Sequence, residues 1–256
     1  MEQVLLFAFV GLLAQIVDGA LGMAFGLVST TVLLAFGVLP ATASASVHVA
    51  EMFTTAASGA AHFAHRNVDF KTFLHLVPAG IIGGVLGVYV LTGVDGAIIR
   101  PFVVAYLALM GALILYRVLR PRPRVPYSAP YTAGLGAVGG FADAIGGGGW
   151  GPLVGSTLMA GGGEPRYVIG TVNASEFLIT VAISSAFAWA LLTGHWQDAG
   201  ALVDHAAAVG GLIVGGIIGA PIASFVVKRV PARQLAVSVG VLVLTVAAFQ
   251  GWQLLA

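Results

Sequence analysis

The sequence predicts an all-α polytopic membrane protein with two inverted repeats, each made of a broken or re-entrant first helix followed by three transmembrane helices. Three observations predict this fold class: an apolar composition, a polar pattern that occurs twice, and a one-sided placement of basic residues. Of the 256 residues, 59% are hydrophobic and 8% are charged, and the mean hydropathy is +1.00. Soluble domains carry about 25% charged residues, so we expect this chain to lie within a bilayer.

Long apolar stretches mark the individual helices. Five stretches reach the roughly 20 residues that a helix needs to cross a bilayer, and they cover residues 72–94, 97–119, 168–193, 201–227 and 231–254. The opening run carries Glu2 as its only early charge and lacks the basic segment of a cleaved signal, so we expect it to belong to the mature fold. The chain has no cysteine, which excludes disulfides and thiolate metal sites.

A polar pattern recurs along the chain at a constant spacing of 125 residues. The pairs that carry it are Asp18 and Asp143, Pro40 and Pro165, and Glu51 and Glu176. Coincidences of glycine are expected in a chain with 36 glycines, but acids and prolines in one register indicate a duplication. A glycine motif at residues 83–87 also recurs at 215–219, after an insertion near residues 193–200.

The duplication divides the chain into two halves. We predict an N-terminal repeat over residues 1–119, a cytoplasmic linker over residues 120–130 and a C-terminal repeat over residues 131–256. The linker alternates arginine with proline, and proline prevents a helix from continuing.

The first apolar block of each half is too long for a single span. These blocks cover residues 3–37 and 131–161, and each has glycines and an aspartate near its middle. A half-helix of about 14 residues rises roughly 21 Å, which reaches the bilayer centre. We therefore expect either a broken helix or a re-entrant hairpin, whose non-helical backbone must be covered by protein or water.

The placement of basic residues favours the hairpin. If each first block turns back, one face of the membrane collects Arg66, Lys71, Arg166, the arginines at 117–124 and the basic residues at 228–233, and Arg100 alone lies on the other face. The positive-inside rule makes the basic face cytoplasmic. Each half then has three full spans, and an odd number inverts the second half relative to the first. Eight full spans with parallel halves remain the alternative.

The chain resembles a known family in its twice-occurring glycine-rich block with a central aspartate, in Pro40 and Pro165, and in the two glycine motifs. It is similar to the sulfite exporter TauE/SafE family, also called the 4-toluene sulfonate uptake permease family, over residues 3–254. The resemblance implies a multi-pass permease in a prokaryotic plasma membrane, the inner membrane if the cell is Gram-negative. It also implies a cargo among sulfite, sulfoacetate, organosulfonates and related sulfur anions.

The two breaks are the candidate anion site. Each would begin a half-helix whose free N–H groups point inward, and such helix ends bind anions in transporters. The candidate substrate-binding residues are Gly22, Met23, Phe25, Gly26, Gly147, Gly148, Gly149, Trp150, Gly151, His48 and Asn173. Glycine also permits close helix packing; we favour packing for residues 83–87 and 215–219, and a ligand-facing break for residues 146–149.

Four acids are candidates for proton coupling: Asp18, Asp143, Glu51 and Glu176. The aspartates would also serve as caps of the helices that follow them, and the glutamates would also serve as partners of interior hydroxyls. Acids at bilayer depth are costly and usually functional, so we add a coupling role. His48 lies three residues before Glu51, and Asn173 repeats this spacing before Glu176, which places each pair on one helix face.

The predicted function is secondary transport of small sulfur-containing anions by alternating access coupled to protons. The expected partners are a small anionic substrate and membrane lipid, without nucleic acid, cofactor or metal. A cation or metal-ion transporter that uses the same acids and His48 is the first alternative. An intramembrane enzyme or a non-transporting assembly factor is the second, but no nucleophile stands out and no P-loop, HExxH or GxSxG motif is present.

Overall fold

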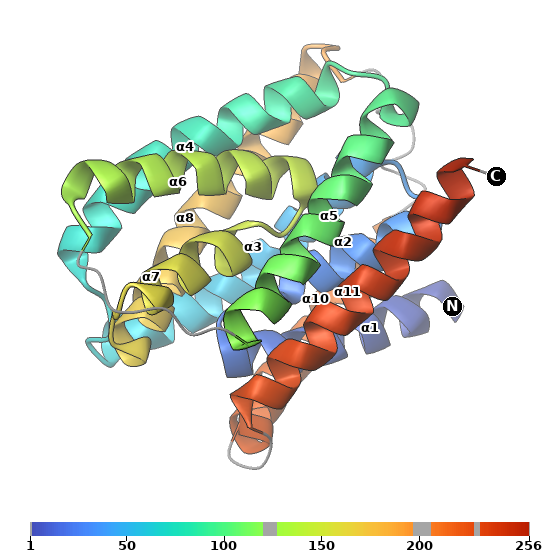
Figure 1. The fold of residues 1–256 in the computed structure, drawn as a ribbon. Coiled ribbons are helices and arrows are strands. Elements are labelled where there is room, and N and C mark those ends of the chain that lie inside the picture. The colour runs from blue at the N-terminus through green and yellow to red at the C-terminus, as the bar shows by residue number, and fades with distance from the viewer. Residues whose placement is uncertain (1, 120–126, 197–205, 228–230, 256) are drawn as a thin grey trace.

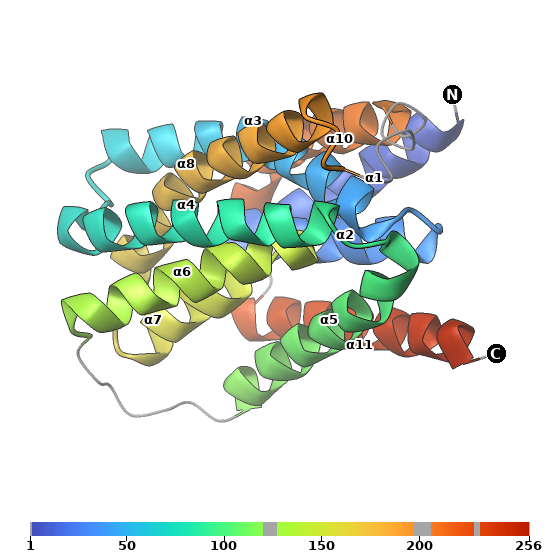
Figure 2. The same ribbon diagram turned by 90° about the horizontal axis from the view of Figure 1, so that it is seen from above.

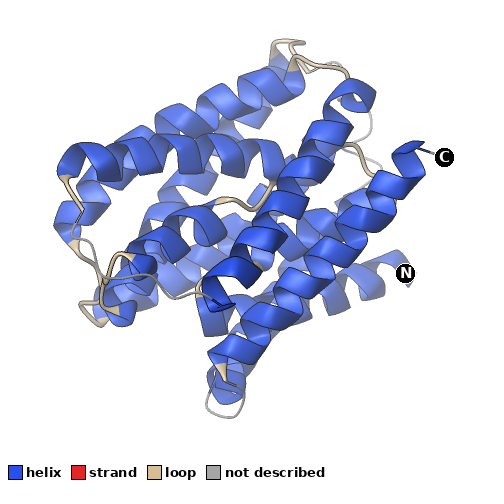
Figure 3. Ribbon diagram, viewed as in Figure 1, coloured by secondary structure: helices blue, strands red, loops and turns tan. Residues whose placement is uncertain are grey.

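The computed structural model describes residues 2–119, 127–196, 206–227 and 231–255, and every regular element within them is helical (Figures 1 and 3). The elements are α1 (Glu2–Leu21), α2 (Phe25–Ala35), α3 (Pro40–Ala64), α4 (Phe70–Thr92), α5 (Gly96–Leu119), α6 (Ala129–Gly146), the π-helical η1 (Trp150–Gly155), α7 (Ser156–Ala160), α8 (Pro165–Leu192), α10 (Ala206–Val227) and α11 (Ala232–Leu255).

Four helices in the described residues are long and apolar enough to cross a membrane, which confirms a polytopic membrane protein. They cover Phe70–Thr92, Gly96–Leu119, Pro165–Leu192 and Arg233–Leu255. The predicted stretch at 201–227 is described from residue 206, where it forms helix α10 (Ala206–Val227). Helix α3 has 25 residues but carries a row of buried polar side chains, which lowers its hydropathy.

Both first blocks are interrupted and turn back on themselves. Gly22 and Gly147, with φ of +66° and +62°, adopt the left-handed conformation that ends α1 and α6. Phe7 near the start of α1 packs edge-on against Phe36 just after α2, with ring centroids 5.8 Å apart. The Tyr127 hydroxyl, just before α6, donates to the main-chain carbonyl of Thr157 in α7. The two ends of each block therefore meet (Figure 1).

The two halves are interleaved rather than side by side. Helix α4 of the first half packs along α6 of the second, and α10 of the second half packs along α1 of the first (Figure 2). The glycine motifs make these contacts possible, because a Cβ on Gly83 would collide with the Ala137 carbonyl and one on Gly215 with the Ala8 carbonyl. The glycines at these two positions therefore lie in close helix packing.

Arg66 and Arg166 lie at the end of the bundle where α3 ends and α8 begins. The Arg166 side chain at the start of α8 donates to Asn67 Oδ1 at 2.5 Å and to the His65 carbonyl at 3.2 Å, just after α3. Helices α3 and α8 thus run in opposite directions. At the far end, Arg100 donates to the Leu34 carbonyl at 3.4 Å.

Several predicted features lie outside the described residues. They are linker residues 120–126 with Arg120, Arg122 and Arg124, insertion residues 197–200, and Lys228 with Arg229.

Candidate functional site

The two glycine breaks, far apart in the sequence, touch each other in the middle of the fold. A Cβ added to Gly26 would lie 2.6 Å from the Cα of Gly148, and one added to Gly151 would lie 2.7 Å from the Cα of Met23. The Thr30 hydroxyl donates to the Gly147 carbonyl at 2.7 Å. Side chains at these positions would hold the breaks apart, so glycine is what brings the two main chains into contact.

Each predicted aspartate caps the element that follows its break. Asp143 Oδ1 accepts from the N–H groups of Gly149 at 2.7 Å and Trp150 at 3.0 Å. Asp18 Oδ1 accepts from the N–H of Phe25 at 3.4 Å, the equivalent position of the first half. A carboxylate at a helix N-terminus is stabilised by these donors and by the helix dipole. In this conformation these N–H groups are bonded to the protein's own acids.

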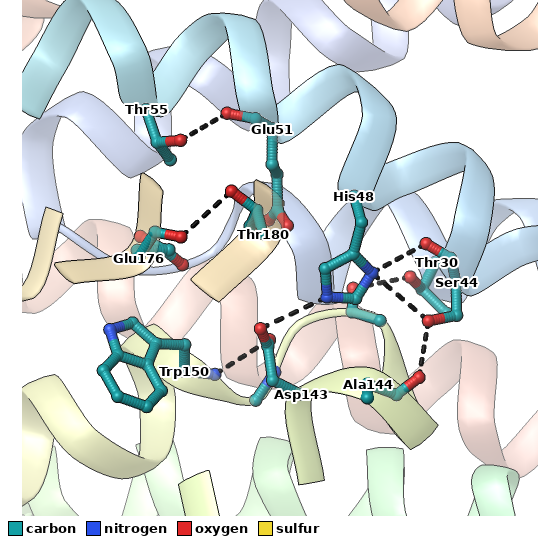
Figure 4. A network of polar contacts seen from close by, with 12 residues as sticks. Thr30, Ser44, His48, Glu51, Thr55, Asp143, Ala144, Trp150, Glu176 and Thr180 are labelled. Carbon is teal, nitrogen blue, oxygen red and sulfur yellow. Dashed lines mark hydrogen bonds and ion pairs between the residues drawn. The ribbon is translucent and has the colours of Figure 1, made fainter. Parts of the chain in front are cut away.

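His48 reaches across from α3 to Asp143 (Figure 4). Its Nε2 lies 3.2 Å from Asp143 Oδ2, and both side chains are fully buried. Its Nδ1 lies 2.8 Å from the Ser44 carbonyl, an acceptor, so Nδ1 carries a proton. Nε2 and Oδ2 would then both be acceptors unless the pair holds a further proton. A proton between Nε2 and Oδ2 would complete a hydrogen bond between His48 and Asp143.

The two glutamates lie near the same centre. Glu51 is 2% exposed, its Oε2 has no hydrogen-bond partner, and its Oε1 would be 2.5 Å from a Cβ on Gly26. Its carboxylate thus lies against the first turn of α2. Glu51 interacts electrostatically with Asp143, Glu176 and Asp18, so all four predicted acids share one neighbourhood. No group of three or more His, Asp or Glu side chains within the described ranges has an arrangement suited to a metal ion.

Two of the predicted substrate-binding residues form hydrogen bonds with other parts of the protein. Asn173 does not repeat the contact of His48: its Oδ1 accepts from Ser58 at 3.0 Å and its Nδ2 donates to the Ile169 carbonyl at 3.0 Å. The Trp150 indole is fully buried and donates to the Val172 carbonyl at 3.2 Å. The two halves therefore share the aspartate caps, but His48 and Asn173 make different contacts.

Sequence reasoning missed Tyr106 in α5. Its ring lies where a Cβ on Gly146 would be, and its hydroxyl lies where a Cβ on Gly149 would be. The hydroxyl is buried and has no hydrogen-bond partner in the part of the chain that the structure describes. An isolated tyrosine in an apolar stretch gives no sign of a functional role. The consecutive hydroxyl residues Ser29, Thr30 and Thr31, in contrast, could have been recognised in the sequence as a polar segment.

The first break carries backbone strain at Ala24. Its φ is 145°, in a region that residues with a Cβ rarely adopt. Such a conformation costs about 1–3 kcal/mol. We expect Ala24→Gly to raise the melting temperature of the purified protein in detergent, because glycine removes this strain. An unchanged or lower melting temperature would contradict the assignment.

Comparisons with known proteins agree with this architecture. The sequence model of the family described as sulfite exporter TauE/SafE matches residues 7–249. A probable membrane transporter protein, YtnM of Bacillus subtilis (strain 168), is 44% identical over 247 residues, which cover 94% of this chain and 80% of that protein. No solved structure shows a significant match.

Proposed function

Since the chain belongs to the sulfite exporter TauE/SafE family, we propose that it carries small sulfur-containing anions, such as sulfite or organosulfonates, by alternating access coupled to protons. That it is a membrane transporter of a prokaryotic plasma membrane follows from the family and from the apolar helices. The buried contact between His48 and Asp143 is the observation that supports the coupling.

Electrostatics explains why an anion needs that proton. Glu51 and Glu176 each interact electrostatically with Asp143 and with Asp18, and an approaching anion is repelled by each of these carboxylates that is ionised. A proton on the His48–Asp143 pair removes one negative charge, so the anion and the proton bind best together. Loss of the proton raises the repulsion and releases the anion. Anion and proton therefore move in the same direction.

Alternating access is supported by the arrangement of the two halves. The equivalent helices α3 and α8 run in opposite directions, and the two breaks meet between them. Inverted repeats that meet at broken helices are the usual framework of secondary transporters, with the site at the repeat interface. We accordingly propose the repeats as 1–119 and 131–256, with 120–130 as the linker.

The substrate site would form when the two breaks separate. In the conformation described here Gly26 and Gly148 are in contact, so an anion between them requires a movement of one break away from the other. The N–H groups of residues 22–26 and 147–151, with His48, would then face the anion. Asn173 is a candidate only for a conformation in which it leaves Ser58.

Cation transport is the competing function, because four buried acids in one neighbourhood also suit a positive charge. The described residues offer no ligand set for a metal ion in this conformation. A proton is the cation that the His48–Asp143 geometry accommodates.

Flux measurements in proteoliposomes test the proposal. A sulfonate such as methanesulfonate is the best probe, because it stays ionised and does not cross lipid as a neutral acid, as sulfite does at low pH. We expect an acidic exterior to drive methanesulfonate uptake and downhill sulfonate influx to acidify the lumen. Protein-free vesicles are the control. Sulfur-anion flux that ignores the pH gradient would refute the coupling, and flux of a divalent cation without anion flux would favour the competing function.

A further inference from the structure

Tyr106, inside helix α5, packs against the second glycine break. A Cβ on Gly146 would overlap the Tyr106 ring, and a Cβ on Gly149 would overlap its hydroxyl. The two glycines between them face the first break instead, because Cβ atoms there would overlap the Thr30 side chain and the main chain of Leu27. The run of four glycines therefore makes room for two neighbours, the first break and a tyrosine.

The Tyr106 hydroxyl lies beside Asp143. The Cβ position of Gly149 that would overlap the hydroxyl also lies 2.9 Å from the main-chain nitrogen of Asp143, and the tyrosine and the aspartate interact electrostatically. The hydroxyl is buried among described helices, and α5 is described on both sides of it, from Gly96 to Leu119. Phenylalanine would fill the same space without burying a polar group, so the hydroxyl needs an explanation.

The charge of Asp143 depends on groups from several neighbouring helices. Hydrogen-bond donors favour its ionised form, and nearby carboxylates favour its protonated form. The N–H groups of Gly149 and Trp150 both donate to Oδ1, and helix α4 faces α6 with glycines. Among the described residues, the titratable groups that act on Asp143 are His48 and Glu51 of α3, Glu176 of α8, Tyr106 of α5 and, through the two glutamates, Asp18 of α1.

We propose that Tyr106 is a positioning residue of the proton site, whose hydroxyl donates a hydrogen bond to the Asp143 carboxylate when that carboxylate is ionised. His48 carries a proton on Nδ1. Once the proton between His48 and Asp143 has left, Nε2 is an acceptor that faces another acceptor, Oδ2. The Tyr106 O–H is then the neighbouring donor that replaces the lost bond. Tyr106 keeps its own proton throughout, so it stabilises the ionised state and does not carry the proton.

The consequence for transport rests on the proposed function. In that function the anion is released when the proton leaves the His48–Asp143 pair, and a donor that stabilises the ionised carboxylate favours this step. The hydrogen bond itself requires no cargo. The bond and its consequence can therefore be tested separately.

An infrared titration of the purified full-length protein in detergent tests the hydrogen bond without any substrate. Subtraction of the Asp143→Asn spectra isolates the carboxylate band of Asp143, and the growth of this band with pH gives the midpoint of ionisation. We expect Tyr106→Phe to raise the midpoint by about one pH unit or more, the effect of losing one hydrogen bond to a charged group. Phenylalanine keeps the ring against Gly146, so the melting temperature should stay near that of the wild type.

Tyr116→Phe is the matched control. Tyr116 lies on the same helix, nearer its C-terminal end, and is 43% exposed. This variant should leave the midpoint of Asp143 unchanged. The same midpoint in Tyr106→Phe as in the wild type would overturn the proposal, whatever the flux measurements show.

Methanesulfonate exchange, with equal pH on both sides of the proteoliposome, separates this proposal from the proposed function. We expect half-maximal exchange by Tyr106→Phe at a pH about one unit higher than in the wild type, because Asp143 keeps its proton to a higher pH. A raised KM with an unshifted midpoint and pH profile would instead make Tyr106 a direct ligand of the anion and overturn the proposal. A shifted midpoint without wild-type exchange would support the hydrogen bond and refute the proposed anion transport.

Discussion

Asp143→Asn is expected to impair proton-driven transport severely while leaving the protein folded. The two oxygens of Asp143 have different partners: Oδ1 accepts from the N–H groups of Gly149 and Trp150, and Oδ2 faces His48. Asparagine keeps an oxygen that can accept from both N–H groups, so the cap survives. It replaces the oxygen that faces His48 with an amide, which cannot share a proton. The variant therefore separates the capping role from the coupling role.

The expected loss is large because the pair is fully buried. We expect the pH-driven flux of methanesulfonate to fall by roughly tenfold or more, which corresponds to about 1.4 kcal/mol or more on the rate-limiting barrier. Lumenal acidification should decrease in parallel. Asp143→Ala removes the cap as well and should lower the melting temperature by the equivalent of about 1 kcal/mol or more.

Asp18→Asn is the matched control for this experiment. Asp18 occupies the same position of the first half and caps Phe25 at 3.4 Å, but its counterpart of His48 is Asn173, which bonds to Ser58. We expect this variant to lose less flux than Asp143→Asn. Wild-type flux and wild-type coupling in Asp143→Asn would reduce Asp143 to a structural cap and remove the proposed proton site.

The local breaks were predictable from the sequence, but the partners of the breaks were not. Glycines beside an aspartate in an overlong apolar block predict interrupted helices, and the structure has interruptions at residues 22–24 and 147–149. Hydropathy identifies which segments enter the membrane, but it does not predict which helices are neighbours in the fold. The interleaving of α1 with α10 and of α4 with α6 therefore had no signal beyond the glycine motifs that permit it.

The buried polar residues near the breaks were also only partly predictable from the sequence. The repeated spacing singled out Asp143 and placed His48 and Glu51 on one face of a helix. The contact of His48 with Asp143 joins residues 95 positions apart, on segments that only the tertiary fold brings together. Repeat symmetry also predicts a similar role for Asn173, and there the physics differs, because an amide cannot form an ion pair with Asp18 and bonds to Ser58 instead.

Gly148→Ala is expected to have the largest effect on stability. A Cβ at this position would overlap the main-chain nitrogen of Leu27 and the carbonyl carbon of Gly26, and backbone atoms cannot rotate away as a side chain does. We expect a loss of about 3 kcal/mol or more, at or above the upper end of the usual cost of overpacking. Thermal unfolding in detergent and the yield of monodisperse protein measure it.

Substitutions at two other glycines serve as controls for Gly148→Ala. A Cβ on Gly155 would make an ordinary contact with Val172 at 3.6 Å, so Gly155→Ala should be neutral or slightly stabilising. A Cβ on Gly216 would meet the Thr54 methyl group at 2.8 Å, which a small side-chain movement relieves, so Gly216→Ala should lie between the two. If the loss of stability follows this order, the role of Gly148 is to allow the close contact between the two breaks. A Gly148→Ala variant with wild-type melting but no sulfonate flux would instead assign it to the substrate, because only a ligand-facing glycine loses function without losing stability.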